Sequence, residues 1–200
     1  RRQDLHGAIH LREDHSRLHD SHPMKTSHED AVIETQRLLL RQMTPDDAPA
    51  LLKVFGDAEA MRHYPAAFDE ARMQAWVTWN RRSYETRGHG LWAMILRSTG
   101  EVIGDCGLVS QEVDGSPEIE VGYHVRRDLW GKGLATEAAL ACIDHGFTQF
   151  GFRRFVSLIH PQNASSRRVA EKIGMKLRRE TEWRGKATCI YGIERGTRVS

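Results

Sequence analysis

A glycine-rich segment at residues 130–135, WGKGLA, has the composition of an anion-binding turn. A strand-like run at 119–125 precedes it, and a helical pattern running to Phe150 follows without a break. At such a helix start the backbone N–H groups are unpaired, and the helix dipole adds roughly half a positive charge. Glycines let a phosphate group approach the backbone closely. The predicted phosphate-binding amides are those of Gly131, Gly133, Leu134, Ala135 and Thr136.

Two other side chains of this segment can assist, although the glycines could also belong to an ordinary loop. Lys132 can add a positive point charge to the amides. Trp130 is predicted to anchor the base of the loop by packing, with direct ligand contact as the alternative. Ala135 is small enough to let the following helix pack closely on a sheet.

A second block, HPQNASSRRVAEKIGM at 160–175, has the signals of another helix beginning near the first. Asn163 is a good N-cap residue, and Gly174 is a good stop. Arg167, Arg168 and Lys172 give this helix a basic face that could contact an anionic ligand or simply face solvent.

The elements that must position these blocks follow from periodicity and turn residues. Strands are predicted at 33–42, 91–96, 101–110, 118–125, 154–159, 175–183 and 186–194, with turns at 114–117 and 184–185. Helices are predicted at 44–55, 58–63, 69–86, 133–150 and 163–173. This order is mixed α/β, with strand meanders and one βαβ unit around the glycine-rich segment.

The two blocks together make the chain resemble the GCN5-related N-acetyltransferase (GNAT) family, most closely the RimJ/RimL-like type that acetylates ribosomal-protein N-termini. The resemblance runs from about Ile33 to about Glu194. It implies the GNAT-type acyl-CoA N-acyltransferase fold, a twisted and mostly antiparallel sheet with flanking helices. The fourth and fifth strands splay apart in that fold, and acetyl-CoA, the implied co-substrate, enters the cleft between them.

The resemblance also assigns roles to residues of both blocks. The glycine-rich segment would bind the pyrophosphate of acetyl-CoA, and Asn163 and Ser166 would lie beside the thioester and the pantetheine arm. Where Trp130 stands the family often has Gln or Arg, so the phosphate contacts here should come almost wholly from the backbone. A backbone N–H near Val125, released from the sheet by a bulge, would polarise the thioester carbonyl.

The reaction implied is transfer of an acetyl group to a primary amine, which must first lose a proton. Glu120 is the candidate base, with a surface carboxylate as the alternative; Glu118 shares its face of the strand. Ser166 and Tyr191 are the candidates for protonating the CoA thiolate. His124 adjoins Val125, but strand alternation alone does not decide whether it faces the core, solvent or the thioester.

Simple amine chemistry favours some acceptors over others. An α-amine has a pKa of about 7.7–8.0 and a lysine side chain about 10.4, so at neutral pH the α-amine gives up its proton more readily. A protein N-terminal α-amine or a small-molecule amine is therefore the expected acceptor. The region 64–79 and the closing hairpin should form its pocket, although their aromatic side chains could equally be core. These are Phe68, Trp76, Trp79 and Trp183.

Bulk properties narrow the remaining possibilities. The 200 residues suit one folded unit, and the net charge of +2 implies no general attraction to nucleic acid or membranes. No apolar run approaches the roughly 20 residues of a membrane span. Three cysteines without metal or disulfide spacing suit reduced thiols in the cytoplasm. We expect no metal, a monomer or a homodimer, and, as the alternative to an enzyme, a non-catalytic acyl-CoA-binding sensor on the same fold.

The first 30 residues differ from the rest of the chain. They contain six histidines, many charges and few apolar residues. We expect 1–30 to be a disordered His-rich leader, vector-derived or an upstream extension, and 31–196 to be a single N-acetyltransferase domain. Metal binding is the alternative for the leader, because His6 and His10, like His15 and His19, are four residues apart.

Overall fold

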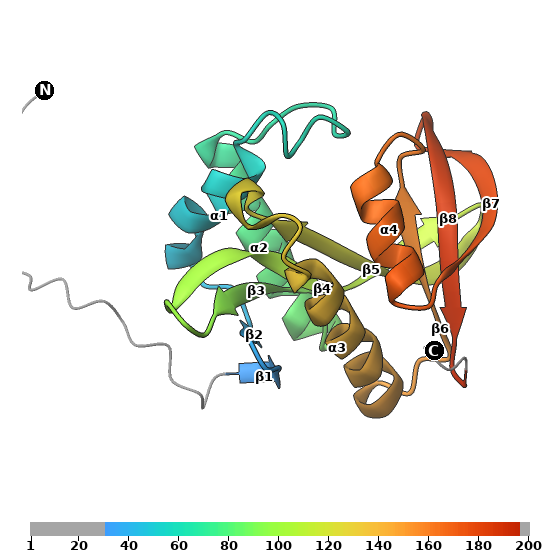
Figure 1. The fold of residues 1–200 in the computed structure, drawn as a ribbon, viewed down its shortest axis with the longest axis horizontal. Helices are drawn as coiled ribbons and strands as arrows, with labels where there is room; N and C mark the ends of the chain where they lie inside the picture. The colour runs from blue at the N-terminus through green and yellow to red at the C-terminus, as the bar shows by residue number, and fades with distance from the viewer. Residues whose placement is uncertain (1–30, 197–200) are drawn as a thin grey trace, which may run out of the picture.

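The computed structural model describes residues 31–196, which form one eight-stranded sheet with helices on both faces (Figure 1). The strands are β1 (Ala31–Glu34), β2 (Leu38–Arg41), β3 (Leu91–Leu96), β4 (Glu101–Val113), β5 (Ser116–Val125), β6 (Arg154–Ile159), β7 (Lys176–Trp183) and β8 (Lys186–Glu194). Their spatial order is β1-β2-β3-β4-β5-β6-β8-β7, and every neighbouring pair is antiparallel except β5–β6. The mixed α/β, mostly antiparallel prediction is confirmed.

Four α-helices within residues 31–196 cover the sheet. They are α1 (Ala48–Phe55), α2 (Glu70–Arg87), α3 (Leu134–Gln149) and α4 (Ala164–Lys172), with short 3-10 turns η2 (Pro45–Asp47) and η3 (Arg127–Leu129). Local signals set the ends of α2: the Asp69 carboxylate accepts the backbone N–H of Arg72 at 2.8 Å, and Gly88 ends the helix in the left-handed region. Both ends lie within one residue of the prediction.

The helices divide the apolar core into two layers. On one face α3 and α4 bury Trp92, Phe155 and Tyr191, whereas on the other α1 and α2 bury Phe55 and Met73. Burial of each such side chain contributes about 1.5–3 kcal/mol, so both faces of the central strands are held by packing. The sheet therefore separates two apolar core layers, and packing on both faces holds its central strands in place.

The hairpin joining β4 to β5 is tighter and longer than the sequence predicted. Only Asp114 and Gly115 form the turn, with φ of 50° and 75°, as a type I′ turn requires. Pairing then runs without a shift from Val113↔Ser116 to Gly104↔Val125. This continuous register fixes which side chains of the two strands stand opposite one another.

Two predicted elements differ in the structure. The single strand at 33–42 is two strands, because Thr35 turns the chain through hydrogen bonds with Leu38. The helix at 58–63 is a series of turns. The Asp57 carboxylate accepts the backbone N–H groups of Glu59 and Ala60, but Pro65 follows too soon for a helix to grow.

The sheet opens between its two parallel strands. β5 and β6 are paired only at Glu120↔Val156. From there towards Val125 the strands diverge, and Figure 1 shows α3 and α4 on either side of the divergence. The predicted fourth and fifth strands, at 118–125 and 154–159, are β5 and β6 of the structure, because the first predicted strand is two strands. The splayed-strand prediction is confirmed. No helix within 31–196 combines the length and apolar character needed to cross a bilayer. The predicted leader lies outside the described residues.

Candidate active site

The start of α3 presents backbone amides that no side chain caps. Gly133 is the N-cap and makes no side-chain capping bond. Both loop glycines have positive φ, 77° at Gly131 and 78° at Gly133, which other residues adopt only with strain. A Cβ at Gly131 would meet no atom of residues 31–196 within 4 Å, so the described structure leaves the space above this backbone open. This amide cradle has the shape and polarity to hold a diphosphate.

An arginine that sequence reasoning missed fixes the loop. Arg37 donates to the carbonyl of Lys132 at 2.8 Å and to the carboxylate of Glu137 at 2.6 Å. Thr35 also donates to Glu137, at 2.6 Å. Partial burial opposes the charge of Glu137, but these hydrogen bonds outweigh it and lower its pKa. The segment between β1 and β2 therefore holds the Glu137 carboxylate, in the first turn of α3, away from the amide cradle.

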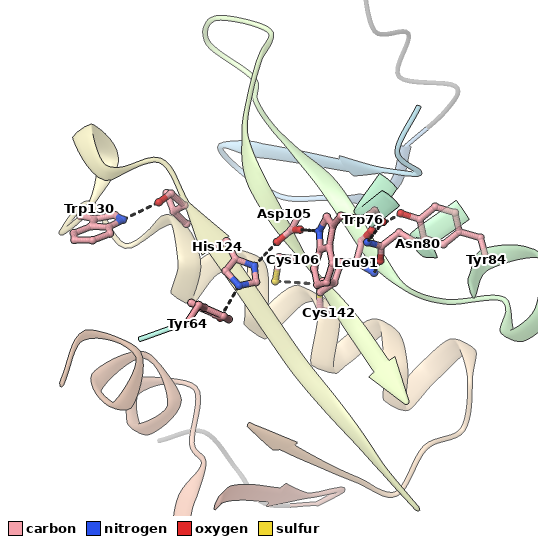
Figure 2. Close-up of polar contacts among 11 residues, drawn as sticks. Tyr64, Trp76, Asn80, Tyr84, Leu91, Asp105, Cys106, His124, Trp130 and Cys142 are labelled. Atoms are coloured by element: carbon pink, nitrogen blue, oxygen red, sulfur yellow. Dashed lines mark hydrogen bonds and ion pairs between the residues drawn. The ribbon is translucent and has the colours of Figure 1, made fainter. Parts of the chain in front are cut away.

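Trp130 holds the other end of the loop to the sheet. Its indole Nε1 donates to the carbonyl of Val125 at 2.7 Å, while its side chain is 41% exposed (Figure 2). The N–H and C=O of one strand residue point to the same side, so the Val125 amide also faces the opening beside β5. The bulge predicted at Val125 is absent from the β4–β5 ladder. Divergence of β6, rather than a bulge, exposes this backbone edge.

A cavity of about 250 Å³ lies between this loop, α4 and the turns after α1. We call it the loop cavity. It is lined by Trp130, Gly131, Gly133, Leu134, Ala135, Thr136, Asn163, Ser166 and Val125, and Lys132 is exposed in the same loop. Arg168 and Lys172 of α4 also line it, whereas Arg167 turns away and donates to Tyr191 at 2.9 Å. The predicted cofactor-binding residues are thus gathered around one opening.

The second block, 160–175, contains α4, and one side of this helix forms a wall of the loop cavity. The Asn163 side chain accepts the backbone N–H of Ser166 at 3.1 Å and caps the helix. The Tyr123 hydroxyl donates to the Ser166 carbonyl at 2.9 Å, joining α4 to β5. Tyr191 is only 1% exposed, and its hydroxyl contacts Arg167 and Glu171. The structure brings Ser166 to the cleft but leaves Tyr191 in the core.

A second cavity of about 970 Å³ lies on the α2 side of the sheet. We call it the aromatic cavity. Its aromatic walls come from the two regions named in the sequence analysis, as Tyr64, Phe68, Trp76, Trp79 and Trp183. Arg72, Arg87, Arg184 and Lys186 also line it, and among the lining residues that the structure describes Glu120 is the one carboxylate. Its lining is apolar with an excess of positive charge.

Glu120 projects into the aromatic cavity from the point where β5 and β6 meet. Its carboxylate accepts the Gln111 side-chain amide at 2.8 Å and the backbone N–H of Leu158. Burial raises the pKa of Glu120, and these hydrogen bonds oppose the shift only in part. Glu118, on the same face, is instead paired with Arg154. Glu120 therefore combines access to a cavity with raised proton affinity.

The most connected polar group at the opening is a histidine whose role the sequence left undecided (Figure 2). His124 Nδ1 lies 2.7 Å from the carboxylate of Asp105 on β4, and Nε2 lies 2.7 Å from the Tyr64 hydroxyl. Asp105 is fully buried and also accepts the indole N–H of Trp76 at 3.0 Å. The His124 ring packs against Phe55 at 4.6 Å. Four segments therefore hold this imidazole in one orientation.

The two cavities meet at this histidine. The residues that line both are His63, Tyr64, Tyr123, His124, Asn163 and Ser166. A molecule in the loop cavity and another in the aromatic cavity could therefore touch through the opening between β5 and β6. Within 31–196, no group of three or more His, Cys, Asp or Glu side chains is arranged to hold a metal ion.

Comparison with known proteins agrees with this geometry. Residues 37–176 match the family described as "Acetyltransferase (GNAT) domain". "Uncharacterized protein YkkB" of Bacillus subtilis (strain 168) is 38% identical over 160 residues, which cover 80% of this chain and 93% of that protein. "Uncharacterized N-acetyltransferase p20" of Bacillus licheniformis is 30% identical over 151 residues, covering 72% of this chain and 82% of that protein.

Solved structures share the architecture. One is RimL, a ribosomal L7/L12 alpha-N-protein acetyltransferase in complex with coenzyme A. It superposes with a TM-score of 0.65 at 18% identity, covering 80% of this chain and 95% of that one. At this identity the likeness shows the fold alone.

Proposed function

The chain belongs to the GNAT family and is an N-acetyltransferase, and from that premise we propose an acceptor, a base and a route for the reaction. The acetyl group passes from acetyl-CoA to the α-amine of a protein N-terminus or to a small-molecule amine. The observation that carries this proposal is the meeting of the two cavities at the opening between β5 and β6. The loop cavity suits acetyl-CoA, and the aromatic cavity suits the amine.

The loop cavity fits acetyl-CoA through groups already on one surface. The amides at the start of α3 would hold the diphosphate, Arg168 or Lys172 could meet the 3′-phosphate, and Asn163 and Ser166 would lie along the pantetheine arm. Each charge-assisted hydrogen bond to the diphosphate contributes about 1.5–3 kcal/mol. The Val125 amide, facing the opening, would polarise the thioester carbonyl.

Glu120 is the proposed base for the first proton of the acceptor ammonium. Its raised pKa brings its proton affinity nearer to that of an amine, which favours transfer. Glu120 lines the aromatic cavity but not the loop cavity, so it would act through water rather than at the thioester itself. Ser166, which lines both cavities, would donate a hydrogen bond on the side of the departing sulfur.

The charge of the aromatic cavity bears on the acceptor. Four cationic side chains line it against the carboxylate of Glu120. A polycation such as a polyamine or an aminoglycoside would be repelled there, whereas an amine that also carries a carboxylate would be attracted. An acidic protein N-terminus or an amino acid therefore fits better than a polyamine. A cytoplasmic location, where the unpaired Cys106, Cys142 and Cys189 would stay reduced, is part of the proposal.

A thiol-release screen tests the proposal directly. The protein would be incubated with acetyl-CoA and separate pools of acidic N-terminal peptides, basic N-terminal peptides, amino acids, polyamines and aminoglycosides. We expect CoA thiol release with the acidic peptides or amino acids, weakened by salt. Preference for the polyamines would contradict the charge argument. Tight acetyl-CoA binding without thiol release from any pool would favour the alternative, a non-catalytic acyl-CoA sensor.

A further inference from the structure

We propose that Asp105, His124 and Tyr64 form a proton relay that takes the second proton from the attacking nitrogen and returns it to the departing sulfur of CoA. This inference rests on the proposed function and adds a group that Glu120 cannot replace. It is carried by three contacts at the junction of the two cavities, drawn in Figure 2.

The hydrogen-bond directions follow from the chemistry of the partners. An ionised carboxylate only accepts, so Asp105 requires a proton on His124 Nδ1. Nε2 of the neutral ring is then an acceptor and receives the Tyr64 hydroxyl proton at 2.7 Å. Tyr64 is 44% exposed as a residue, but desolvation of its hydroxyl at the opening raises the pKa of the phenol, and the charges of Glu120 and Asp105 add to the shift. The phenol therefore stays protonated and able to donate. The phenol oxygen keeps its lone pairs for a group in either cavity.

Distance along β5 separates this relay from Glu120. The two residues lie on one face but four positions apart, about 13 Å at 3.3 Å per residue. Glu120 lines only the aromatic cavity, whereas His124 and Tyr64 line both cavities. Val125, whose amide is proposed to meet the carbonyl, adjoins His124, so the reacting atoms lie at the histidine end. Glu120 can prepare the amine in its cavity, but the group in reach during bond formation is His124 with Tyr64.

The proton balance needs such a group. The free amine attacks the carbonyl carbon, the C–N bond forms, and the nitrogen is left with one proton too many. The Tyr64 oxygen accepts this proton while its own passes to Nε2, giving an imidazolium paired with Asp105. The carbonyl re-forms, the C–S bond breaks and its electron pair leaves on sulfur. The proton then returns through Tyr64 to that sulfur, giving the amide and the CoA thiol.

Other charged and titratable groups also face the junction. Glu120 on β5 interacts electrostatically with His124, and Arg184 of the closing hairpin lies near Glu120. His63 and His160 stack at 5.1 Å across the same opening, and burial with the nearby Arg62 and His160 lowers the pKa of His63. Asp105 is the carboxylate in direct contact with His124, so its removal should have the largest effect on the imidazolium.

Matched substitutions test the relay in the whole protein. His124→Gln should lower kcat by about 100-fold or more, the usual contribution of a positioned acid–base group. The affinity for acetyl-CoA, measured by calorimetry, should change little. His89→Gln is the control, since His89 is also buried and bonded through Nδ1, to the Leu108 carbonyl, but lines neither cavity. Tyr64→Phe is paired in the same way with Tyr84→Phe, whose buried hydroxyl contacts the Leu91 carbonyl.

Asp105→Asn supplies a readout that a merely structural role would not move. An amide at this position can donate to Nδ1 as well as accept from it, so the ring should no longer be held with its proton on Nδ1. Long-range ¹H–¹⁵N NMR of His124 should show the proton on Nδ1 and none on Nε2 in the parent protein, and a share of the proton on Nε2 in Asp105→Asn. Asn80→Asp, a carboxylate added beside Trp76 outside both cavities, should leave the parent tautomer in place.

Three results would overturn the relay. They are an Nε2-protonated His124, a His124→Gln enzyme within threefold of the parent, and an unchanged His124 tautomer in a folded Asp105→Asn protein. Absence of thiol release from the unaltered protein would instead remove the proposed function, and the catalytic role of the relay with it. Failure of the relay in an active enzyme is thus distinguishable from failure of the proposed function.

Discussion

The open space above Gly131 leads to a prediction with an internal control. Gly131→Ala places a methyl group where the structure has no protein atom within 4 Å, and where the diphosphate is proposed to lie. Gly115→Ala makes the same change at the β4–β5 turn, where φ is 75° rather than 77° and the surroundings are equally open. The two substitutions share their backbone strain and differ in their distance from the loop cavity.

The expected magnitudes separate strain from binding. A left-handed alanine costs roughly 1 kcal/mol of folding free energy, so both variants should lose about 2–4 °C in Tm. In Gly131→Ala the methyl group also holds the diphosphate away from at least one amide. Loss of one charge-assisted hydrogen bond is worth about 1.5–3 kcal/mol, or roughly 10- to 150-fold in Kd. Gly115→Ala should bind acetyl-CoA within twofold of the parent protein.

Calorimetric titration with acetyl-CoA measures the difference, and acetyl-pantetheine provides a matched ligand. It lacks the diphosphate and the adenosine, so Gly131→Ala should barely change its KM. Equal Kd values for acetyl-CoA in Gly131→Ala and Gly115→Ala, with both proteins folded, would refute the amide cradle. A parallel loss for acetyl-pantetheine would show that the substitution acts through the shape of the cleft and not through the diphosphate.

Three further outcomes follow from the same contacts. Arg37→Met removes the hydrogen bonds to Lys132 and Glu137, so acetyl-CoA should bind about tenfold more weakly by fluorescence titration. An unchanged Kd would contradict the role of Arg37 in fixing the loop. Glu120→Gln should slow turnover and abolish its carboxylate-dependent acid limb, whereas near-normal turnover across pH 6–9 would exclude it as the base. Burial lowers the pKa of His89 below its unfolded value of 6.5, so the unfolded chain binds more protons and stability falls as pH drops below 6.5. The slope of Tm between pH 6.5 and 5 should therefore be shallower in His89→Gln, and an unaltered slope would contradict this assignment.

Local signals predicted most of the elements because each depends on residues next to one another. The helix at 133–150 and the strand at 154–159 were predicted to within one residue. Capping at Asn163 and the stop at Gly174 likewise need no knowledge of distant contacts. The glycine-rich loop was predictable for the same reason, since strand, turn and helix N-terminus are contiguous in the chain.

Long-range contacts limited the prediction of the site. Arg37 reaches Glu137 and Lys132 across about a hundred residues of sequence, and nothing near it in the chain indicates a phosphate loop. Tyr191 has the chemistry of an acid, but packing of β8 under α4 buries it. The bulge expected at Val125 was an inference from one strand alone, whereas divergence of the neighbouring β6 exposes that amide.

The Asp105–His124 pair is different, because the sequence contained a signal for it. Asp–Gly between two strand-like runs is typical of a two-residue type I′ turn. Such a turn pairs Val113 with Ser116, and eight residues further along each strand it places Asp105 opposite His124. Opposed residues share a face, so their side chains must lie within reach. Predicting a four-residue turn at 114–117 instead pairs Val113 with Glu118, a shift of two residues that places Asp105 opposite Arg126 rather than His124. The predicted length of the β4–β5 turn therefore decided whether the Asp105–His124 pair could be predicted from the sequence.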